Sequence, residues 1–208
     1  MQTSDYLCRK ATASDDAAMI AKYLYLTDPY IYPSICQDPA DPMWVALIRE
    51  CLQTQDDLYQ LEHISVVLFR GQIVGVACVI PCGKSLAFAK NMQQNTQVRH
   101  KLQSAMEGYF LPMLAEAKGS VGYSLTNFCI DGDHQGKGIG SLFLSHCVET
   151  YGSQPMHLDV IAANQSAVRL YEKAGFRIEK HYSGFTGSEV ELPCYHMVFL
   201  PKTESVAY

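Results

Sequence analysis

The feature that most constrains this chain is a glycine-rich junction between a predicted strand and a predicted helix. Residues 124–130 are largely apolar and predict a strand, and residues 135–140, here called the glycine-rich loop, read Gln-Gly-Lys-Gly-Ile-Gly. From Ser141 onward, apolar residues recur at the i, i+3, i+4 and i+7 positions of a helix. These residues are Leu144, Cys147, Val148 and Tyr151. Glycine adopts positive φ without strain, and amide groups at a helix start attract anions. The junction therefore predicts a main-chain site for a diphosphate group.

The spacing of the glycines excludes two common phosphate-binding loops. A Walker loop requires a glycine five residues before its Gly-Lys pair and a serine or threonine after it. Here Lys137 is followed by Gly138, and no glycine stands five residues before Gly136. A dinucleotide fingerprint requires the spacing G-x-G-x-x-G, which the three glycines miss by one residue. A structural turn remains the alternative for the loop taken alone.

A second segment strengthens the functional interpretation. Residues 156–161 predict an apolar strand, and the following stretch reads Asn-Gln-Ser-Ala-Val-Arg-Leu-Tyr-Glu-Lys-Ala-Gly-Phe from Asn164 to Phe176. Asn164 suits the N-cap of a helix that starts at Gln165, and Gly175 suits its C′ position. Phe176 is then expected to begin the next strand. One apolar face of this helix is predicted from Ala167, Leu170, Tyr171 and Ala174.

Together the two segments resemble the signatures of the Gcn5-related N-acetyltransferase (GNAT) superfamily. The first is similar to its Q/R-x-x-G-x-G/A motif, and the second to its N-x-x-A-x-x-L-Y-x-K-x-G-F motif. The resemblance covers residues 122–199 well and residues 6–81 more loosely, and it says little about 82–120. It implies a single N-acetyltransferase domain over residues 1–208 with an α/β (α+β) fold. Its central sheet would be mixed and mostly antiparallel, with about seven strands, helices on both faces and a splayed strand pair.

The resemblance implies an enzyme that moves acetyl from acetyl-CoA, its cosubstrate, to a primary amine by direct attack in a ternary complex. The diphosphate would lie on the glycine-rich loop, and the pantetheine arm would lie between the splayed strands. A strand amide near Cys129 would hold the oxyanion. The implied cofactor-binding residues are Phe128, Cys129, Ile130, Gln135, Gly136, Lys137, Gly138, Ile139, Gly140, Ser141, Asn164 and Ala167.

Tyr171 matches the family position whose hydroxyl faces the CoA sulfur, so the resemblance makes it the general acid. A core aromatic is the alternative, and a phenol can fill both roles because its ring is buried while its hydroxyl finds a partner. Asn164 either contacts the pantetheine arm or only caps its helix. Lys137 either contacts phosphate or is solvated.

The sequence leaves the general base open. Some family members carry a carboxylate on the strand before the loop, but residues 123–130 contain no Asp or Glu, and Ser124 stands at that position. Asp131 is expected to be a loop residue. His157 and Asp159 alternate on one predicted strand, so they can share a face as a base or as structural residues. A base that acts through water is equally compatible.

The rest of the chain shows further strand and helix patterns without a repeat. Arg9 and Asp15 are similar to the family's opening R-x-A-x-x-x-D. Four prolines predict a loop over residues 29–42, and residues 70–72 predict a hairpin turn. Further strands are predicted over residues 6–10, 64–69, 73–80, 177–182 and 195–200, and helices over 15–26, 43–52 and most of 84–119.

Composition narrows the partners and the compartment. The net charge is −5 and no basic stripe is present, so a nucleic-acid partner is not expected, whereas a cationic amine is mildly favoured. The longest apolar stretches have the length of strands, and the first residues lack the features of a signal peptide, so no membrane association is expected. The eight scattered cysteines contain no CxxC pair and predict core thiols in the cytoplasm, without disulfides or metal.

The acceptor amine is not fixed by the sequence. A small molecule or a peptide fits, and the site would be shaped by residues 29–42, 82–120 and 183–189. Tyr30, Tyr32 and Trp44 would form an aromatic wall there or pack in the core, and Glu107 and Tyr109 are further candidates. A different acyl group, a non-catalytic CoA-binding sensor or scaffold, a phosphate-binding domain unrelated to CoA, and a homodimer all stay open.

Overall fold

The computed structural model describes residues 5–29, 32–33, 36–55, 58–82, 120–182 and 192–201. The strands are β1 (Tyr6–Lys10), β2 (Ile64–Phe69), β3 (Gln72–Pro81), β4 (Tyr123–Ile130), β5 (Met156–Ile161), β6 (Arg177–Tyr182) and β7 (Cys194–Phe199). The α-helices are α1 (Ala17–Tyr25), α3 (Pro42–Gln53), α7 (Ile139–Tyr151) and α8 (Gln165–Lys173), and the short 3-10 turns are η2 (Leu61–His63) and η4 (Gly132–His134). The predicted helix over 84–119, the segment 183–189 and Tyr30 lie outside the described residues.

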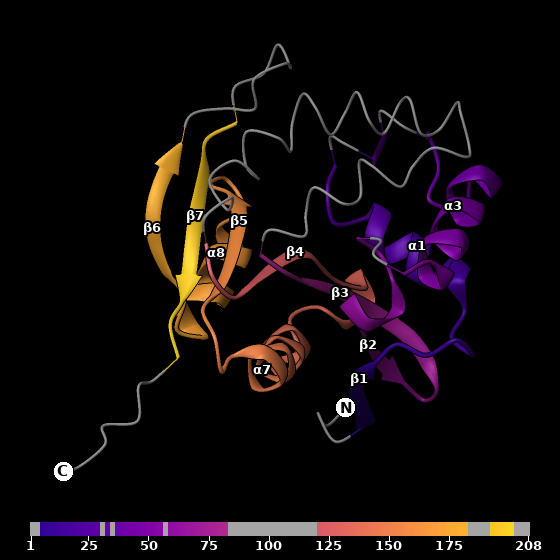
Figure 1. Cartoon of the computed structure of the whole chain (residues 1–208), viewed down its shortest axis with the longest axis horizontal. Helices are drawn as coiled ribbons and strands as arrows, with labels where there is room; N and C mark the ends of the chain where they lie inside the picture. The colour runs from indigo at the N-terminus through magenta and orange to yellow at the C-terminus, as the bar shows by residue number, and fades with distance from the viewer. Residues whose placement is uncertain are drawn as a thin grey trace.

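Seven strands of the described chain form one sheet in the order β1-β2-β3-β4-β5-β7-β6 (Figure 1). Every neighbouring pair is antiparallel except β4 and β5, which are parallel. The prediction of a mixed, mostly antiparallel sheet of about seven strands is therefore confirmed.

The parallel pair β4–β5 separates almost as soon as it forms. Its register contains two pairs, Tyr123 with Met156 and Ser124 with His157. On their other sides both strands are paired over most of their length, β4 with β3 and β5 with β7. The predicted splayed pair is thus present, and its opening begins directly after Ser124 and His157.

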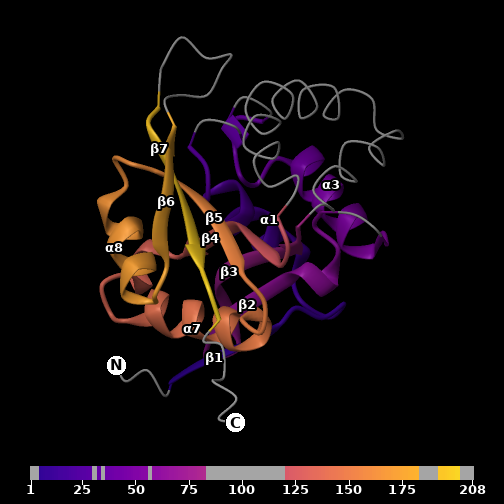
Figure 2. The ribbon, with the colours of Figure 1, turned by 60° about the vertical axis from the view of Figure 1, so that its left-hand side comes forward.

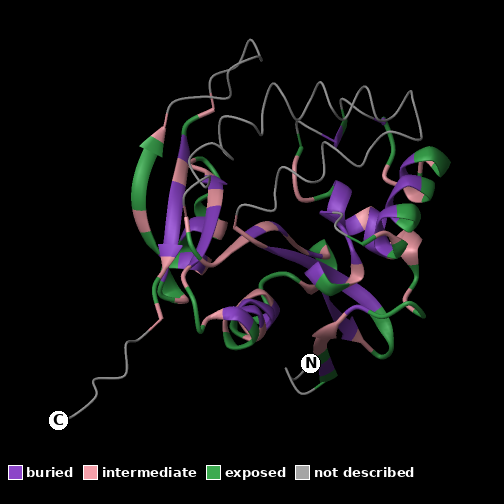
Figure 3. Ribbon diagram, in the orientation of Figure 1, coloured by how far each residue is buried: buried purple, intermediate pink, exposed green. Residues whose placement is uncertain are grey.

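Helices cover both faces of the sheet, as predicted (Figure 2). The buried side chains of α1 and α3 pack with Val66 and Val76, whereas those of α7 and α8 pack with Val67 and Ala77. Successive side chains of a strand point to opposite faces, so β2 and β3 supply both cores. Figure 3 shows the result, with β2 and β3 buried over almost their whole length. In the described part of the chain, no helix is long and apolar enough to cross a membrane.

The first helix is fixed to the sheet by polar contacts that its sequence encodes. The Asp16 side chain caps α1 by accepting a hydrogen bond from the Ala18 amide at 2.8 Å. Arg9 on β1 donates two hydrogen bonds to the Asp15 carboxylate, at 2.6 and 2.7 Å. The predicted Arg9–Asp15 motif therefore links the end of β1 to the residue that precedes the cap.

The two helices near the glycine-rich loop follow the sequence pattern with small differences. Helix α7 begins at Ile139, two residues earlier than expected, because the last two residues of the loop already have helical geometry. Helix α8 begins at Gln165 as predicted, and the Asn164 side chain accepts from the Ala167 amide at 3.2 Å. It ends before Gly175, whose φ is +97°. The prediction missed Val168, which is buried beside Tyr171, whereas Ala167, Leu170 and Ala174 are only partly buried.

Phe143 provides a test of the core beneath α7. Its ring is fully buried and lies 5.4 Å from the Phe128 ring. We expect Phe143→Ala to lower the free energy of unfolding by about 3–5 kcal/mol, because it leaves a cavity under the helix. Urea denaturation followed by the fluorescence of Trp44, the single tryptophan, measures the change. Leu7→Ala, at an exposed position, should change it by less than about 0.5 kcal/mol. A loss below about 1 kcal/mol for Phe143→Ala would contradict this packing.

Candidate functional site

A cleft of about 790 Å³ opens where β4 and β5 separate. Its walls come from the outer half of β4, the end of β5, the starts of α7 and α8, and the residues that follow α1. The lining residues are Leu26, Thr27, Asp28, Pro29, Tyr32, Leu125, Thr126, Asn127, Phe128, Cys129, Ile130, Gln135, Gly136, Gly138, Gly140, Ser141, Asp159, Val160, Ile161, Ala163, Asn164, Ser166, Ala167, Leu170, Tyr171 and Cys194. The volume is in the range of sites that bind small molecules and cofactors.

The glycine-rich loop has the geometry of a main-chain anion site. Gly136 and Gly138 have φ of +71° and +81°, and a Cβ at either position would meet no atom within 4 Å. Gly138 is the N-cap of α7 and supplies no side chain to cap it. The first amides of a helix lack intrahelical acceptors, so those of α7 are available to a ligand. The loop therefore leaves free space for a ligand beside main-chain amide groups that can bind it.

Side chains within and just before the loop fix its path. The Gln135 amide donates to the Ile130 carbonyl oxygen at 2.8 Å, and Lys137 Nζ donates to the Asp133 carbonyl oxygen. The Asp131 carboxylate caps η4 by accepting from the Asp133 amide at 3.0 Å. These contacts hold the loop to the end of β4 without a ligand.

The structure brings most of the predicted site residues together. The cleft lining includes Tyr171 and, from the predicted cofactor set, Phe128, Cys129, Ile130, Gln135, Gly136, Gly138, Gly140, Ser141, Asn164 and Ala167. Two predicted residues differ: Lys137 is exposed and directed to Asp133, and the Ile139 side chain is buried in the core with an exposed fraction of 1%. These two residues can reach a ligand in the cleft only through their main-chain groups in this conformation.

Tyr171 lines the cleft from α8. Its ring lies beside Phe128 and Phe176, with centroid distances of 6.4 and 5.9 Å. Burial raises the pKa of the phenol well above its usual value, with a smaller contribution from Cys147, and no hydrogen bond from a described residue contributes to the shift. The hydroxyl is therefore protonated at neutral pH. The ring is packed in the core, as one of the two predicted roles requires, and the role of proton donor stays a prediction.

Asp131 connects α1 to the loop rather than facing the cleft. The Tyr23 hydroxyl donates to Asp131 Oδ2 at 2.8 Å, and Lys22 Nζ lies 3.6 Å from the same oxygen. The Tyr23 hydrogen bond lowers the pKa of the Asp131 carboxyl, against a smaller opposing effect of burial. Asp131 is thus the loop residue that the sequence predicts.

A buried polar group forms the wall on the side of α1. Asn127 Nδ2 donates to Thr27 Oγ1 at 2.7 Å and to the Tyr32 hydroxyl at 2.9 Å, and the Tyr32 and Tyr59 hydroxyls are 2.6 Å apart. Burial raises the pKa of Tyr32 to about 12. The predicted aromatic wall is divided: Tyr32 lines the cleft, whereas Trp44 is packed in the core, 5.2 Å from the Tyr32 ring.

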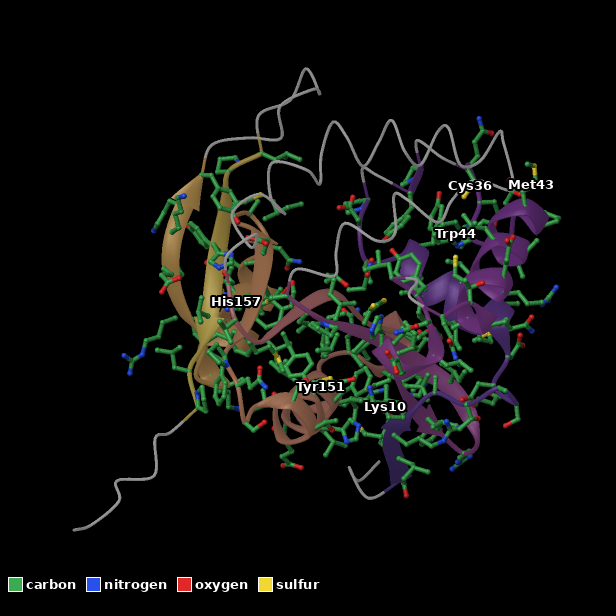
Figure 4. The ribbon with its side chains drawn as sticks, in the orientation of Figure 1. Lys10, Cys36, Met43, Trp44, Tyr151 and His157 are labelled. Carbon is green, nitrogen blue, oxygen red and sulfur yellow. The ribbon has the colours of Figure 1, made fainter. Side chains whose placement is uncertain are left out.

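A polar chain that the sequence prediction missed in part joins β5 to β7. Asp159 Oδ1 is 2.9 Å from His196 Nδ1, and His196 Nε2 is 3.3 Å from His157 Nδ1. His157 and Asp159 therefore share one face, as their alternation predicts. His196 is the register partner of Asp159 on β7, 37 residues away, so only the strand pairing reveals it. Burial is the main cause that lowers the pKa of His157. His157 is labelled in Figure 4, near β5 and β7.

Comparison with known proteins identifies the family. The model of the Acetyltransferase (GNAT) family matches residues 24–176. The chain belongs to this family. Among solved structures, an N-acetyltransferase from Staphylococcus aureus Mu50 is 16% identical, with a TM-score of 0.65, over 92% of this chain and 99% of that one. An acetyltransferase from Salmonella typhimurium with its cofactor acetyl-CoA is 16% identical, with a TM-score of 0.54, over 98% of each chain. At this identity the two structures show the shared fold alone.

A curated relative matches a shorter stretch of this GNAT protein. The [ribosomal protein bS18]-alanine N-acetyltransferase of Salmonella typhimurium is 39% identical over 56 residues, which are 26% of this chain. The match spans 38% of the length of that relative.

The Tyr23–Asp131 contact generates a prediction about acid stability. The pKa of Asp131 is lower when the protein is folded, so its contribution is present above about pH 4, the pKa of an unfolded Asp, and is lost as the pH falls further. At pH 7 we expect Tyr23→Phe to lower the free energy of unfolding by about 1.5 kcal/mol. The difference from wild type should shrink between pH 5 and pH 3 in urea denaturation.

Tyr25→Phe is the matched control for this prediction. The Tyr25 hydroxyl donates to the Cys36 carbonyl oxygen, which does not titrate, so the cost of its removal should not depend on pH in this range. If Tyr23→Phe costs the same at pH 3 as at pH 7, the Asp131 carboxylate is not the partner that matters.

Proposed function

We propose that this protein is an N-acetyltransferase that binds acetyl-CoA in the cleft and transfers the acetyl group to a primary amine by direct attack in a ternary complex. Family membership supports the reaction class. The observation that carries the proposal is the position of the open glycine-rich loop at the end of β4, where this strand has left β5.

The residues present fit the two ends of acetyl-CoA. We assign the diphosphate to the loop and first-turn amides between Gly136 and Ser141, because both glycines leave room and the start of α7 attracts anions. We assign the pantetheine arm to the outer half of β4. Past Ser124, β4 has a register partner on one side only within the described sheet, so alternate main-chain groups point toward the cleft. Asn164 and Ala167 border the same space from α8.

The reaction requires little covalent chemistry from the protein. The thioester supplies an activated acetyl group when it is bound. A β4 amide near Cys129 would stabilise the negative charge that develops on the carbonyl oxygen, and the Tyr171 hydroxyl would donate a proton to the departing sulfur. Holding the amine and the thioester in contact supplies much of the rate.

We propose an α-amino group of a peptide as the first acceptor to test, because the curated relative is named as an alanine N-acetyltransferase. A polyamine and an aminoglycoside complete the panel. The buried thiols Cys147 and Cys194 suit a reducing compartment, so we propose a cytoplasmic location. A CoA sensor is the second candidate, and Tyr171 favours the enzyme because a tyrosine at this family position lines the cleft. Tight binding of acetyl-CoA without turnover on any amine would favour the sensor.

Gly138→Asp tests the loop assignment. The substitution places a negative charge and a side chain where the diphosphate would bind, so the Kd for acetyl-CoA should rise by about 100-fold, equivalent to about 2.7 kcal/mol. Isothermal titration calorimetry measures this directly. Gly71→Asp is the matched control, because Gly71 also has a φ of +81° and open space but lies in the turn between β2 and β3. An unchanged Kd for Gly138→Asp would refute the assignment.

Tyr171→Phe tests the proton donor. Removal of the hydroxyl should lower kcat by about 100-fold while the Kd for acetyl-CoA and the thermal midpoint stay nearly unchanged. Tyr151→Phe is the control, because Tyr151 is also a mostly buried tyrosine of a helix but is not a lining residue of the cleft. Figure 4 labels Tyr151 at α7. Full activity of Tyr171→Phe in a CoA-release assay would remove this residue from the mechanism.

A further inference from the structure

The cleft lining carries two kinds of polar group. The glycine-rich loop offers amide donors, whereas Asp28 and Asp159 add carboxylates from the loop after α1 and from β5. Among the described lining residues there is no Lys, Arg or His. An acceptor amine is a cation before it reacts, so the two carboxylates favour its arrival beside the splayed strands.

Asp159 is a partly buried acidic residue, and a hydrogen bond with His196 holds its carboxylate in place. Its side chain has an exposed fraction of 14%, and that of His196 has 10%. His196 Nδ1 donates to Asp159 Oδ1, which leaves Oδ2 for a further donor. Asp159 lies two residues beyond the last β4–β5 register pair, so it borders the opening between the two strands.

The hydrogen-bond pattern assigns a direction to the chain of histidines. His157 Nε2 donates to the Val121 carbonyl oxygen at 3.3 Å, so the neutral His157 ring accepts a hydrogen bond at Nδ1. The donor to that nitrogen is His196 Nε2, at 3.3 Å. In this pattern His196 donates from both ring nitrogens, to His157 and to the Asp159 side chain. Lys180 on β6 is the register partner of His196.

The other candidate bases are less well placed. Asp131 accepts from Tyr23, lies near Lys22 and does not line the cleft. Ser124, which occupies the strand position where some relatives carry a carboxylate, is paired with His157 before the opening.

We propose that Asp159 binds the acceptor ammonium group and takes a proton from it, and that His196 positions the Asp159 carboxylate for this step. The inference rests on the proposed acetyl transfer and names the acceptor class, a primary ammonium ion. Proton transfer from R–NH3+ to Asp159 gives a neutral amine, whose nitrogen then forms the bond to the acetyl carbon while the carbon–sulfur bond breaks. Tyr171 gives its proton to the sulfur and regains one from the new amide nitrogen. Asp159 returns its proton to water, so the net products are the amide, CoA and one proton.

Asp159→Asn separates charge from structure. The asparagine Oδ1 can still accept from His196, but the side chain no longer attracts or deprotonates an ammonium ion. With an N-terminal-alanine peptide as acceptor, kcat/KM should fall by about 100-fold or more, whereas the Kd for acetyl-CoA should stay within about twofold. Glu149→Gln, the same chemical change at an exposed position of α7, should leave both unchanged. Wild-type kcat/KM in Asp159→Asn would overturn the proposal.

The positioning role of His196 requires a pair of variants. His196→Phe removes the donor to Asp159 and should lower kcat by about 10-fold. His196→Asn should recover most of this loss, because the asparagine Nδ2 occupies the place of the ring Nδ1. Equal losses in both variants, or none in either, would remove His196 from the mechanism.

A binding measurement keeps the test independent of the true acceptor. In protein labelled with 15N-histidine and saturated with CoA, n-propylammonium chloride should shift the His196 Nδ1 resonance, and the shift should be absent in Asp159→Asn. Tetramethylammonium, which cannot donate a hydrogen bond, is the control. No shift in the wild-type protein would overturn this inference, whereas failure to bind CoA at all would overturn the proposed function instead.

Discussion

The early separation of β4 from β5 is the constraint on which the site depends. Two parallel strands that stay paired would use their main-chain groups for each other, and side chains would fill the space between them. Here the register ends at Ser124 and His157, while β3 and β7 hold the outer edges of the two strands. The pairing with β3 and β7 therefore keeps β4 and β5 in place although the two strands do not pair with each other past this point. Their unpaired main-chain groups form part of the wall of the cleft.

The two cores on either face of the sheet give the opening its shape. Helices α7 and α8 pack against one face and direct their starts toward the end of β4, while α1 packs on the other face and places Thr27 and Asp28 at the cleft. The contact between Tyr23 and Asp131 connects the two sides at the point where the loop leaves β4. Amide donors and carboxylates thus reach the same cleft from opposite faces of one sheet, which matches a reaction between an anionic cofactor and a cationic amine.

The local features of this fold could be predicted from the sequence because they depend on residues that are close together in the chain. The bounds of β1, β2, β5 and β6, the Asn164 cap and the end of α8 at Gly175 follow from apolar periodicity and from the conformations that Asn and Gly favour. The side-chain directions near the loop were harder. The burial of Ile139 and the contact of Lys137 with Asp133 depend on how the loop turns into α7, which spacing alone does not define.

The polar contacts across strands could not be predicted for a related reason. His196 reaches Asp159, and Asn127 reaches Tyr32, only after the strands have paired and α1 has packed on the sheet. No periodicity marks these partners, because 37 and 95 residues separate them along the chain. The glycine-rich loop is a contiguous motif and was predicted, whereas the hydrogen-bond partners of Asp159 and Asn127 depend on tertiary contacts and were not.

The most direct test of this account is a crystal structure of the protein with CoA. The account predicts that the diphosphate oxygens accept hydrogen bonds from the amides between Gly136 and Ser141, and that the pantetheine arm lies along β4 in the opening toward β5. A diphosphate found away from these amides, with the glycine-rich loop bare, would contradict the central claim even if the enzyme proved active.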